Sequence, residues 1–164
     1  MSNIPKSKRT ISEMNFYRLA FKLENKIRLV IIPSILKEKG TIKDFAGNEY
    51  NWDTEFYKFT AKSLAEDLDK NITNVIAELR FANSFYPSKD LSNNEFFKRE
   101  RSKHQVNAIG YCYCILANFE RYIIYFNKKA DLLLSLTDEV EHLISSIKSW
   151  KKSNKKIFAS EEKI

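Results

Sequence analysis

The feature that most limits how this chain can fold is the spacing of its apolar residues. In four long stretches they recur every three or four positions, the spacing that stacks side chains along one face of an α-helix. The sequence therefore predicts long amphipathic helices that pack against one another. The clearest stretch carries the apolar residues Ala61, Leu64, Ala65, Leu68, Ile72, Val75, Ile76, Leu79 and Ala82.

Glycine and proline are scarce, which supports the helical prediction. The 164 residues contain 3 glycines and 3 prolines. An all-β domain of this length needs a turn about every ten residues, and turns commonly use these two residue types. With 43% apolar and 30% charged residues, the chain has the composition of a globular domain. Its length suits one domain with a sizeable core.

The first expected helix begins near Ser12, is kinked or locally broken at Pro33, and stops at Gly40. The second, which contains the clearest stretch, has an N-terminal cap in Asp53 or Thr54. The apolar side of the first helix consists of Phe16, Leu19, Ala20, Leu23, Ile27, Val30 and Ile31.

Two more helices are expected over residues 94–126 and 131–153. In the third, the apolar seam is predicted to be Ile109, Cys112, Leu116, Phe119, Ile123 and Phe126. In the fourth, it is Leu133, Leu136, Val140, Leu143, Ile147 and Trp150. Residues 41–52 between the first two helices fit either a short β-hairpin or an irregular loop, since Gly47-Asn48 can form a turn between apolar residues.

Four amphipathic helices joined by short connections are best satisfied by an all-α, antiparallel up-down-up-down bundle. We expect the bundle to span residues 11–153. Residues 1–10 are expected to form a flexible basic arm, and residues 154–164 a basic, flexible tail.

Positive charge collects at one end of this predicted bundle. The formal net charge is +7. In an up-down-up-down topology, the start of the first helix, the second connection and the end of the fourth helix share one end. Twelve cations fall in those segments, which predicts a surface for a polyanion such as nucleic acid. They are Lys6, Lys8, Arg9, Lys98, Arg99, Arg101, Lys103, Lys148, Lys151, Lys152, Lys155 and Lys156.

The helix macrodipole offers a simpler explanation for some of these cations. Lys148 and Lys151 lie near a helix C-terminus, where positive charge is favourable without any ligand. The cations of residues 98–103 lie near a helix N-terminus, where the dipole disfavours them. A phosphate ligand, or an acidic protein bound by an oligomeric adaptor, accounts for those cations better.

Four tyrosines of the third helix, Tyr111, Tyr113, Tyr122 and Tyr125, lie outside its predicted seam. Tyrosines on a long bundle helix commonly pack against a neighbour, so we expect them at a contact between subunits. Stacking on unpaired bases is the alternative.

Neither a membrane span nor a disulfide is expected. The longest purely apolar run, residues 29–32, is far shorter than the roughly 20 residues that a spanning helix needs. No signal peptide is visible at the N-terminus. Cys112 and Cys114 point about 200° apart on a helix, so they form neither a local disulfide nor a metal clip. These features predict a cytoplasmic protein.

Motifs for catalysis, cofactors or metals are sparse. The sequence has no glycine-rich phosphate loop, and Glu139 to His142 is a single copy of a motif that occurs in pairs in di-metal bundles. We therefore expect no enzyme activity, cofactor or metal. Arg99 and His104 fit the Arg-x4-His pattern of HEPN ribonucleases, which are all-α and often dimeric. In that alternative, His104 acts as acid or base on a ribose hydroxyl and Arg99 steadies the phosphate.

The second half of the chain resembles a known family over roughly residues 75–156. The resemblance lies in Ala82-Asn83, Arg101, Asn107-Ala108-Ile109-Gly110-Tyr111-Cys112, Glu120-Arg121-Tyr122-Ile123-Ile124, Glu139 and the ending Ile144-Ser145-Ser146-Ile147-Lys148-Ser149-Trp150-Lys151-Lys152-Ser153-Asn154-Lys155. These residues are similar to those of the accessory variability determinant proteins of diversity-generating retroelements, which are related to four-helix proteins encoded in ribosomal RNA intervening sequences.

The resemblance implies a non-catalytic bundle that assembles into a ring, typically a pentamer. Such rings bind a reverse transcriptase together with its template RNA and support synthesis of mutated cDNA. Ring closure requires head-to-tail contacts between subunits, which the four tyrosines are placed to supply.

Overall fold

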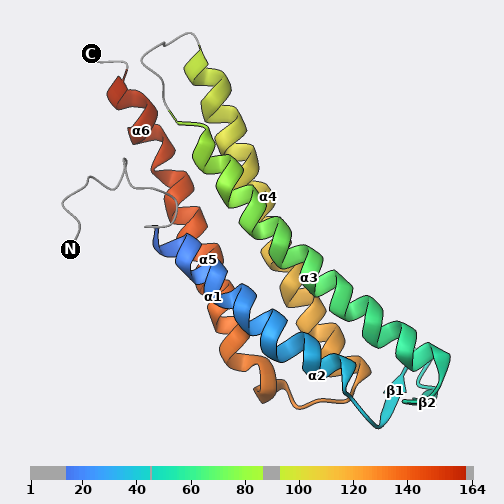
Figure 1. Cartoon of the computed structure of the whole chain (residues 1–164). Coiled ribbons are helices and arrows are strands. Elements are labelled where there is room, and N and C mark those ends of the chain that lie inside the picture. The colour runs from blue at the N-terminus through green and yellow to red at the C-terminus, as the bar shows by residue number, and fades with distance from the viewer. Residues whose placement is uncertain (1–13, 45, 87–92, 162–164) are drawn as a thin grey trace.

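The computed structural model describes residues 14–44, 46–86 and 93–161, with side chains described as far as residue 159. Four long helical segments pack antiparallel, as the sequence predicts, and a small hairpin joins the first two (Figure 1). In chain order the elements are α1 (Asn15–Lys26), η3 (Ile27–Ile31), α2 (Ile32–Leu36), β1 (Thr41–Lys43), β2 (Glu49–Asn51), α3 (Glu55–Ser84), α4 (Asn94–Tyr125), η5 (Ala130–Leu133), α5 (Leu134–Lys152) and α6 (Asn154–Glu161).

The first helical segment continues through Pro33 instead of breaking there. A π-helical turn, η3, directly precedes the proline, and α2 carries it at its N-terminus. Proline lacks an amide hydrogen and its ring clashes with the carbonyl four residues earlier, so a wider turn accommodates it inside the segment. The helix ends at Leu36. Gly40 (φ +137°) therefore lies in the link to β1 and is not the helix stop that the sequence suggested.

Residues 41–52 form a short β-hairpin, one of the two structures that the sequence allowed, and not an irregular loop. Ile42 pairs with Tyr50 in an antiparallel register, and the Ile42 side chain is buried in the core. The Asp44 carboxylate accepts hydrogen bonds from the backbone N–H groups of Ala46 and Asn48, and Gly47 has a φ of +84°. This turn chemistry fixes the hairpin.

The α3 helix follows its sequence pattern closely. All nine apolar residues named for residues 61–82 are buried. The Thr54 hydroxyl accepts a hydrogen bond from the Tyr57 N–H at 3.3 Å, so Thr54 is the N-cap.

The register of α4 differs from the predicted seam. Ile109, Leu116 and Ile123 are half-buried and pack at the margin of the core. The buried row of α4 instead mixes polar and apolar residues, so the apolar spacing in the sequence did not reveal it. It consists of Arg101, Gln105, Ala108, Cys112, Ile115, Asn118, Phe119 and Tyr122.

The predicted flexible tail is wrong for residues 154–161, which form α6. Asn154 and Phe158, four positions apart, are both buried, so this helix has a core-facing side. Just before it, half-buried Trp150 stacks on Phe16 of α1 with ring centroids 4.2 Å apart. The predicted basic arm, residues 1–10, and the last residues of the predicted tail, 162–164, lie outside the described residues.

The two ends of the bundle differ in what they carry. The end of α3, the start of α4 and α6 lie together at one end, which we call the basic end (Figure 1). The hairpin, the start of α3 and the end of α4 lie at the other, which we call the hairpin end.

Candidate nucleic-acid interface

The antiparallel packing of α4 against α5 and α6 brings two groups of predicted cations to the basic end. The start of α4 packs against α6, and Lys148 of α5 reaches Tyr113 near the middle of α4, with its Nζ 3.3 Å from the phenol oxygen. We call the exposed and half-buried cations of this end the basic surface. It comprises Lys98, Arg99, Lys103, Lys148, Lys151, Lys152, Lys155 and Lys156.

The α4 part of the basic surface is partly neutralised by its own helix. Lys98 pairs with Glu95 at 3.1 Å, and Glu100 lies 3.4 Å from Lys103 and 3.7 Å from Arg99. These are surface pairs, which contribute little to stability. They do lower the net positive charge that α4 offers to a ligand.

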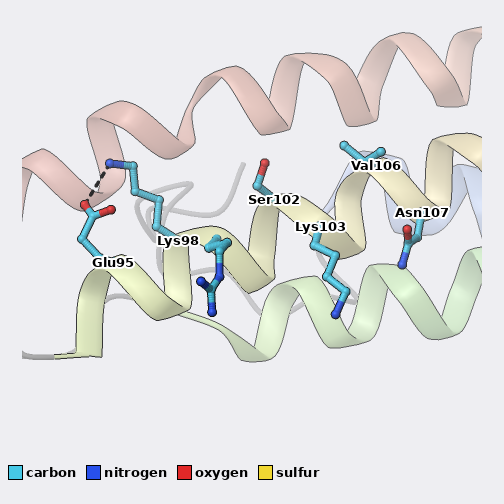
Figure 2. Close-up of a pocket in the computed structure, with 7 residues that line it drawn as sticks. Glu95, Lys98, Ser102, Lys103, Val106 and Asn107 are labelled. Atoms are coloured by element: carbon cyan, nitrogen blue, oxygen red, sulfur yellow. Dashed lines mark hydrogen bonds and ion pairs between the residues drawn. The ribbon is translucent and has the colours of Figure 1, made fainter.

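A shallow hollow follows the outer side of α4 (Figure 2). Lys98 and Ser102 point toward the side of α5 and α6, whereas Lys103 points toward α3. The hollow is therefore open along the helix and has cations on both of its flanks. It is lined by Glu95, Lys98, Arg99, Ser102, Lys103, Val106 and Asn107.

The α5 and α6 part carries the uncompensated charge. Among the described residues, none of its lysines forms an ion pair with a carboxylate. Lys148, Lys152 and Lys155 are exposed and recur at intervals of four and three residues, which places them along one side of the helices. Asn154 and Phe158 occupy the opposite, buried side.

The dipole argument for the α4 cations is weaker than the sequence suggested. The helix begins at Asn94, so Lys98 is its fifth residue and Lys103 lies further along. The macrodipole acts mainly within the first turn, where α4 carries Glu95. These cations are therefore not strongly opposed by the helix, and the lysines of α5 and α6 carry more of the case for a ligand.

Arg101 does not belong to the surface, and its prediction as a nucleic-acid contact is wrong. Its side chain is 0% exposed. The guanidinium donates to the Ala82 and Phe85 carbonyls at the end of α3, at 3.1 and 3.2 Å, and to the Asn154 side chain at 3.0 Å. It also lies 4.6 Å from the centre of the Trp150 ring. Arg101 thus ties three helices together.

This environment leaves the guanidinium without a carboxylate partner. Burial lowers the pKa of Arg101 to about 10, because desolvation disfavours its charged form. The α3 carbonyls, at the negative end of the helix dipole, and the Trp150 ring offset part of that cost. The sequence alone does not show whether a cation on a helix faces solvent or a neighbouring helix. The buried, structural role of Arg101 was therefore not predicted.

A side-chain network extends from Arg101 into α6. The Asn154 amide donates to the Gln105 carbonyl oxygen at 2.7 Å, and both residues are buried. Residues quoted separately for the family resemblance, Ala82, Arg101, Trp150 and Asn154, therefore meet at one place. In this structure, the hydrogen bonds of Asn154 with Arg101 and Gln105 hold α6 against α4.

Of the four predicted interface tyrosines, Tyr122 is misassigned. It is 1% exposed and its hydroxyl donates to the Glu38 carboxylate at 2.7 Å, so it belongs to the core. Burial, together with that carboxylate, raises its pKa. Tyr111 and Tyr125 are half-buried, and Tyr113 is half-exposed beside Lys148 on the basic surface.

The ribonuclease pair is not brought together. The His104 ring nitrogen Nδ1 lies 2.5 Å from the Glu78 carboxylate, and its ring stacks on Phe85 at the α3 side of α4. Arg99 instead lies against Phe96 and Glu100. Five residues along a helix correspond to a rotation of about 140°, so the two side chains diverge.

The remaining motifs give no site. Glu139 pairs with Lys26 of α1, and His142 is exposed. Within the described part of the chain, no group of three or more possible metal ligands occurs. Over the same residues, no helix is both long and apolar enough to cross a membrane.

No family model, no curated protein and no solved structure matches this chain.

Proposed function

We propose that this chain is a non-catalytic accessory protein that binds nucleic acid through the basic surface. The observation that carries the proposal is the set of lysines on α5 and α6, which have no carboxylate partner among the described residues. Lysines that gather on one side without counter-charges repel one another, and phosphates relieve that repulsion.

The more specific form of the proposal rests on the family resemblance. In that form the chain is an accessory protein of a diversity-generating retroelement. It assembles into a ring of five subunits, as in the family it resembles, and binds a reverse transcriptase together with template RNA and cDNA. It acts in the cytoplasm without cofactor or metal and supports mutagenic cDNA synthesis.

Binding of RNA across a salt series tests the nucleic-acid part. We expect affinity to fall steeply with salt. Replacing Lys151, Lys152, Lys155 and Lys156 together by Ala should reduce the slope of log K against log salt by about 3, because four phosphate contacts to a single strand are removed. Helix content by circular dichroism should stay unchanged.

A matched variant distinguishes the effect of removing lysines from the basic surface from the effect of lowering the net charge. Replacing Lys22, Lys58, Lys62 and Lys70, which are exposed on α1 and α3, removes the same charge from other helices. We expect this variant to retain most of the affinity and slope. Equal losses in the two variants would reject a localised interface, and RNA cleavage by the wild type would favour the ribonuclease alternative.

Assembly needs its own measurement. Light scattering of the purified protein should give a mass of several chains, with five for the ring. A monomer at all concentrations would refute the ring. Co-purification with a reverse transcriptase encoded beside this chain would test the protein partner directly.

A further inference from the structure

A cluster of aromatic rings lies along the seam of α3 and α4 at the basic end. The His104 ring is parallel to Phe85 at a centroid distance of 5.6 Å and lies 5.4 Å from Phe81. Phe85 in turn lies 6.3 Å from Phe96 and 6.1 Å from Phe97. We call these five residues the aromatic cluster. Each ring contacts at least one other, and Phe85 contacts three, so the five rings form one connected group.

The aromatic cluster is not part of the hydrophobic core. Its phenylalanines belong neither to the buried core nor to the half-buried residues packed on it. Phe81 remains 54% exposed and Phe96 48% exposed. Large exposed apolar side chains that gather in one place commonly mark an interaction surface.

Cations border the cluster on the side of the basic surface. The Arg99 guanidinium lies 5.7 Å from the centre of the Phe96 ring, and Lys103 is exposed one turn further along α4. Two carboxylates are also close, but both are largely buried and engaged. Glu100 lies beside Arg99 and Lys103, and Glu78 beside His104.

From this juxtaposition we propose that the basic end binds single-stranded nucleic acid, with unpaired bases stacking on Phe96 and Phe81. Exposed rings beside cations are the combination used to bind single strands, because every base has a flat face and every linkage a phosphate. A protein partner with an apolar surface would use the rings but not the cations beside them. The inference rests on the proposed function and narrows its ligand.

A duplex offers the same phosphates but keeps its bases stacked inside. The lysines of α5 and α6 can therefore serve both forms, whereas the aromatic cluster can serve only the single strand. This difference predicts a preference that depends on the rings and not on the lysines.

The test compares a single-stranded oligoadenylate with an RNA duplex of the same length, each titrated with the full-length protein. We expect the single strand to bind more tightly. Replacing Phe81 and Phe96 together by Ala should weaken single-strand binding by about 10-fold or more and leave duplex binding within about twofold. A fluorescent base analogue in the strand should be quenched by the wild type and not by the variant.

Two further variants complete the design. Phe21 and Phe59, 51% and 71% exposed on other surfaces, replaced together by Ala, should leave both affinities unchanged. Replacing Phe81 by Tyr and Phe96 by Trp keeps flat rings and should retain the preference. Equal binding of strand and duplex, unaffected by the Phe81 and Phe96 changes, would overturn the inference while the proposed function stands. Binding of neither RNA would overturn both.

Discussion

The two ends of the bundle differ in how many of their cations are paired with carboxylates. At the hairpin end, each of three cations lies within 3.0 Å of a carboxylate from another part of the chain. At the basic end, the lysines of α5 and α6 have no such partner among the described residues, and Arg101 is buried without a carboxylate. The hairpin-end pairs are Lys43 with Glu49, Arg121 with Asp67, and Lys128 with Glu38.

This contrast separates structural charge from charge left for a ligand. The hairpin end pairs three of its cations with carboxylates, whereas its exposed Lys37, Lys39 and Lys129 form no such pair among the described residues and do not gather on one helix. The basic end uses one cation internally and leaves the rest at the surface. The gathering of unpaired lysines on one side of α5 and α6, more than net charge, therefore indicates where nucleic acid would bind.

We expect the largest loss of stability from a substitution at Arg101. Arg121, on the same helix near the hairpin end, provides the comparison. Arg101→Ala should lower the free energy of unfolding by about 3 to 5 kcal/mol, because it removes buried packing and leaves the α3 carbonyls and Asn154 without their donor. Arg121→Ala, which breaks an exposed pair with Asp67 near the hairpin end, should cost about 1 kcal/mol or less. Urea unfolding measures both. Similar losses would contradict the internal role of Arg101.

Tyr122 should show a smaller effect at the hairpin end. Tyr122→Phe removes the hydrogen bond to Glu38 and should cost about 1.5 kcal/mol, since a buried bond to a charged group is lost. The mass of the assembly should not change, because the side chain lies in the core. Tyr113→Phe on the basic surface should change stability by about 0.5 kcal/mol or less. A change in oligomer mass with Tyr122→Phe would restore it to the subunit contact.

Two glycines provide a third comparison. Gly47 has a φ of +84° in the hairpin turn, so Gly47→Ala should destabilise by about 1 kcal/mol. Gly110 lies within α4, and an added Cβ would meet no atom within 4 Å. Gly110→Ala should therefore stabilise by about 0.5 to 1 kcal/mol through helix propensity. Thermal unfolding resolves both signs, and a stabilising Gly47→Ala would argue against the hairpin turn.

The two cysteines test which side of α4 is buried near its middle, and labelling them requires no substitution. Burial raises the pKa of the Cys112 thiol to about 12, whereas the Cys114 side chain is exposed. Iodoacetamide at about pH 8 should therefore modify Cys114 alone in the native protein and both thiols in denaturant. Mass spectrometry of the labelled peptides reads the result. Rapid native labelling of Cys112 would mean that α4 faces its neighbours in a different register.

The sequence predicted the fold well wherever one helix face was uniformly apolar. The nine seam residues of α3 are buried and Thr54 caps that helix, because periodicity and capping are local properties. The prediction failed for α4, whose central row includes Arg101, Gln105 and Asn118. Polar residues that find partners on other helices break the pattern from which a register is inferred.

For the candidate interface, the sequence placed most cations at one end correctly, because helix order and length determine which segments meet. It could not separate Arg101 from its neighbours or foresee α6. It also gave no sign that Phe85 contacts both His104 and Phe96, since the alignment of α3 with α4 depends on how the connection between them folds.

By itself, the sequence determined the four long helical segments, their order and the end at which positive charge gathers, since these follow from local periodicity and short connections. Only the tertiary structure decided which cations face solvent and which aromatic rings meet. That decision depends on the rotation of each helix about its own axis, and the helix's contacts with its neighbours set that rotation.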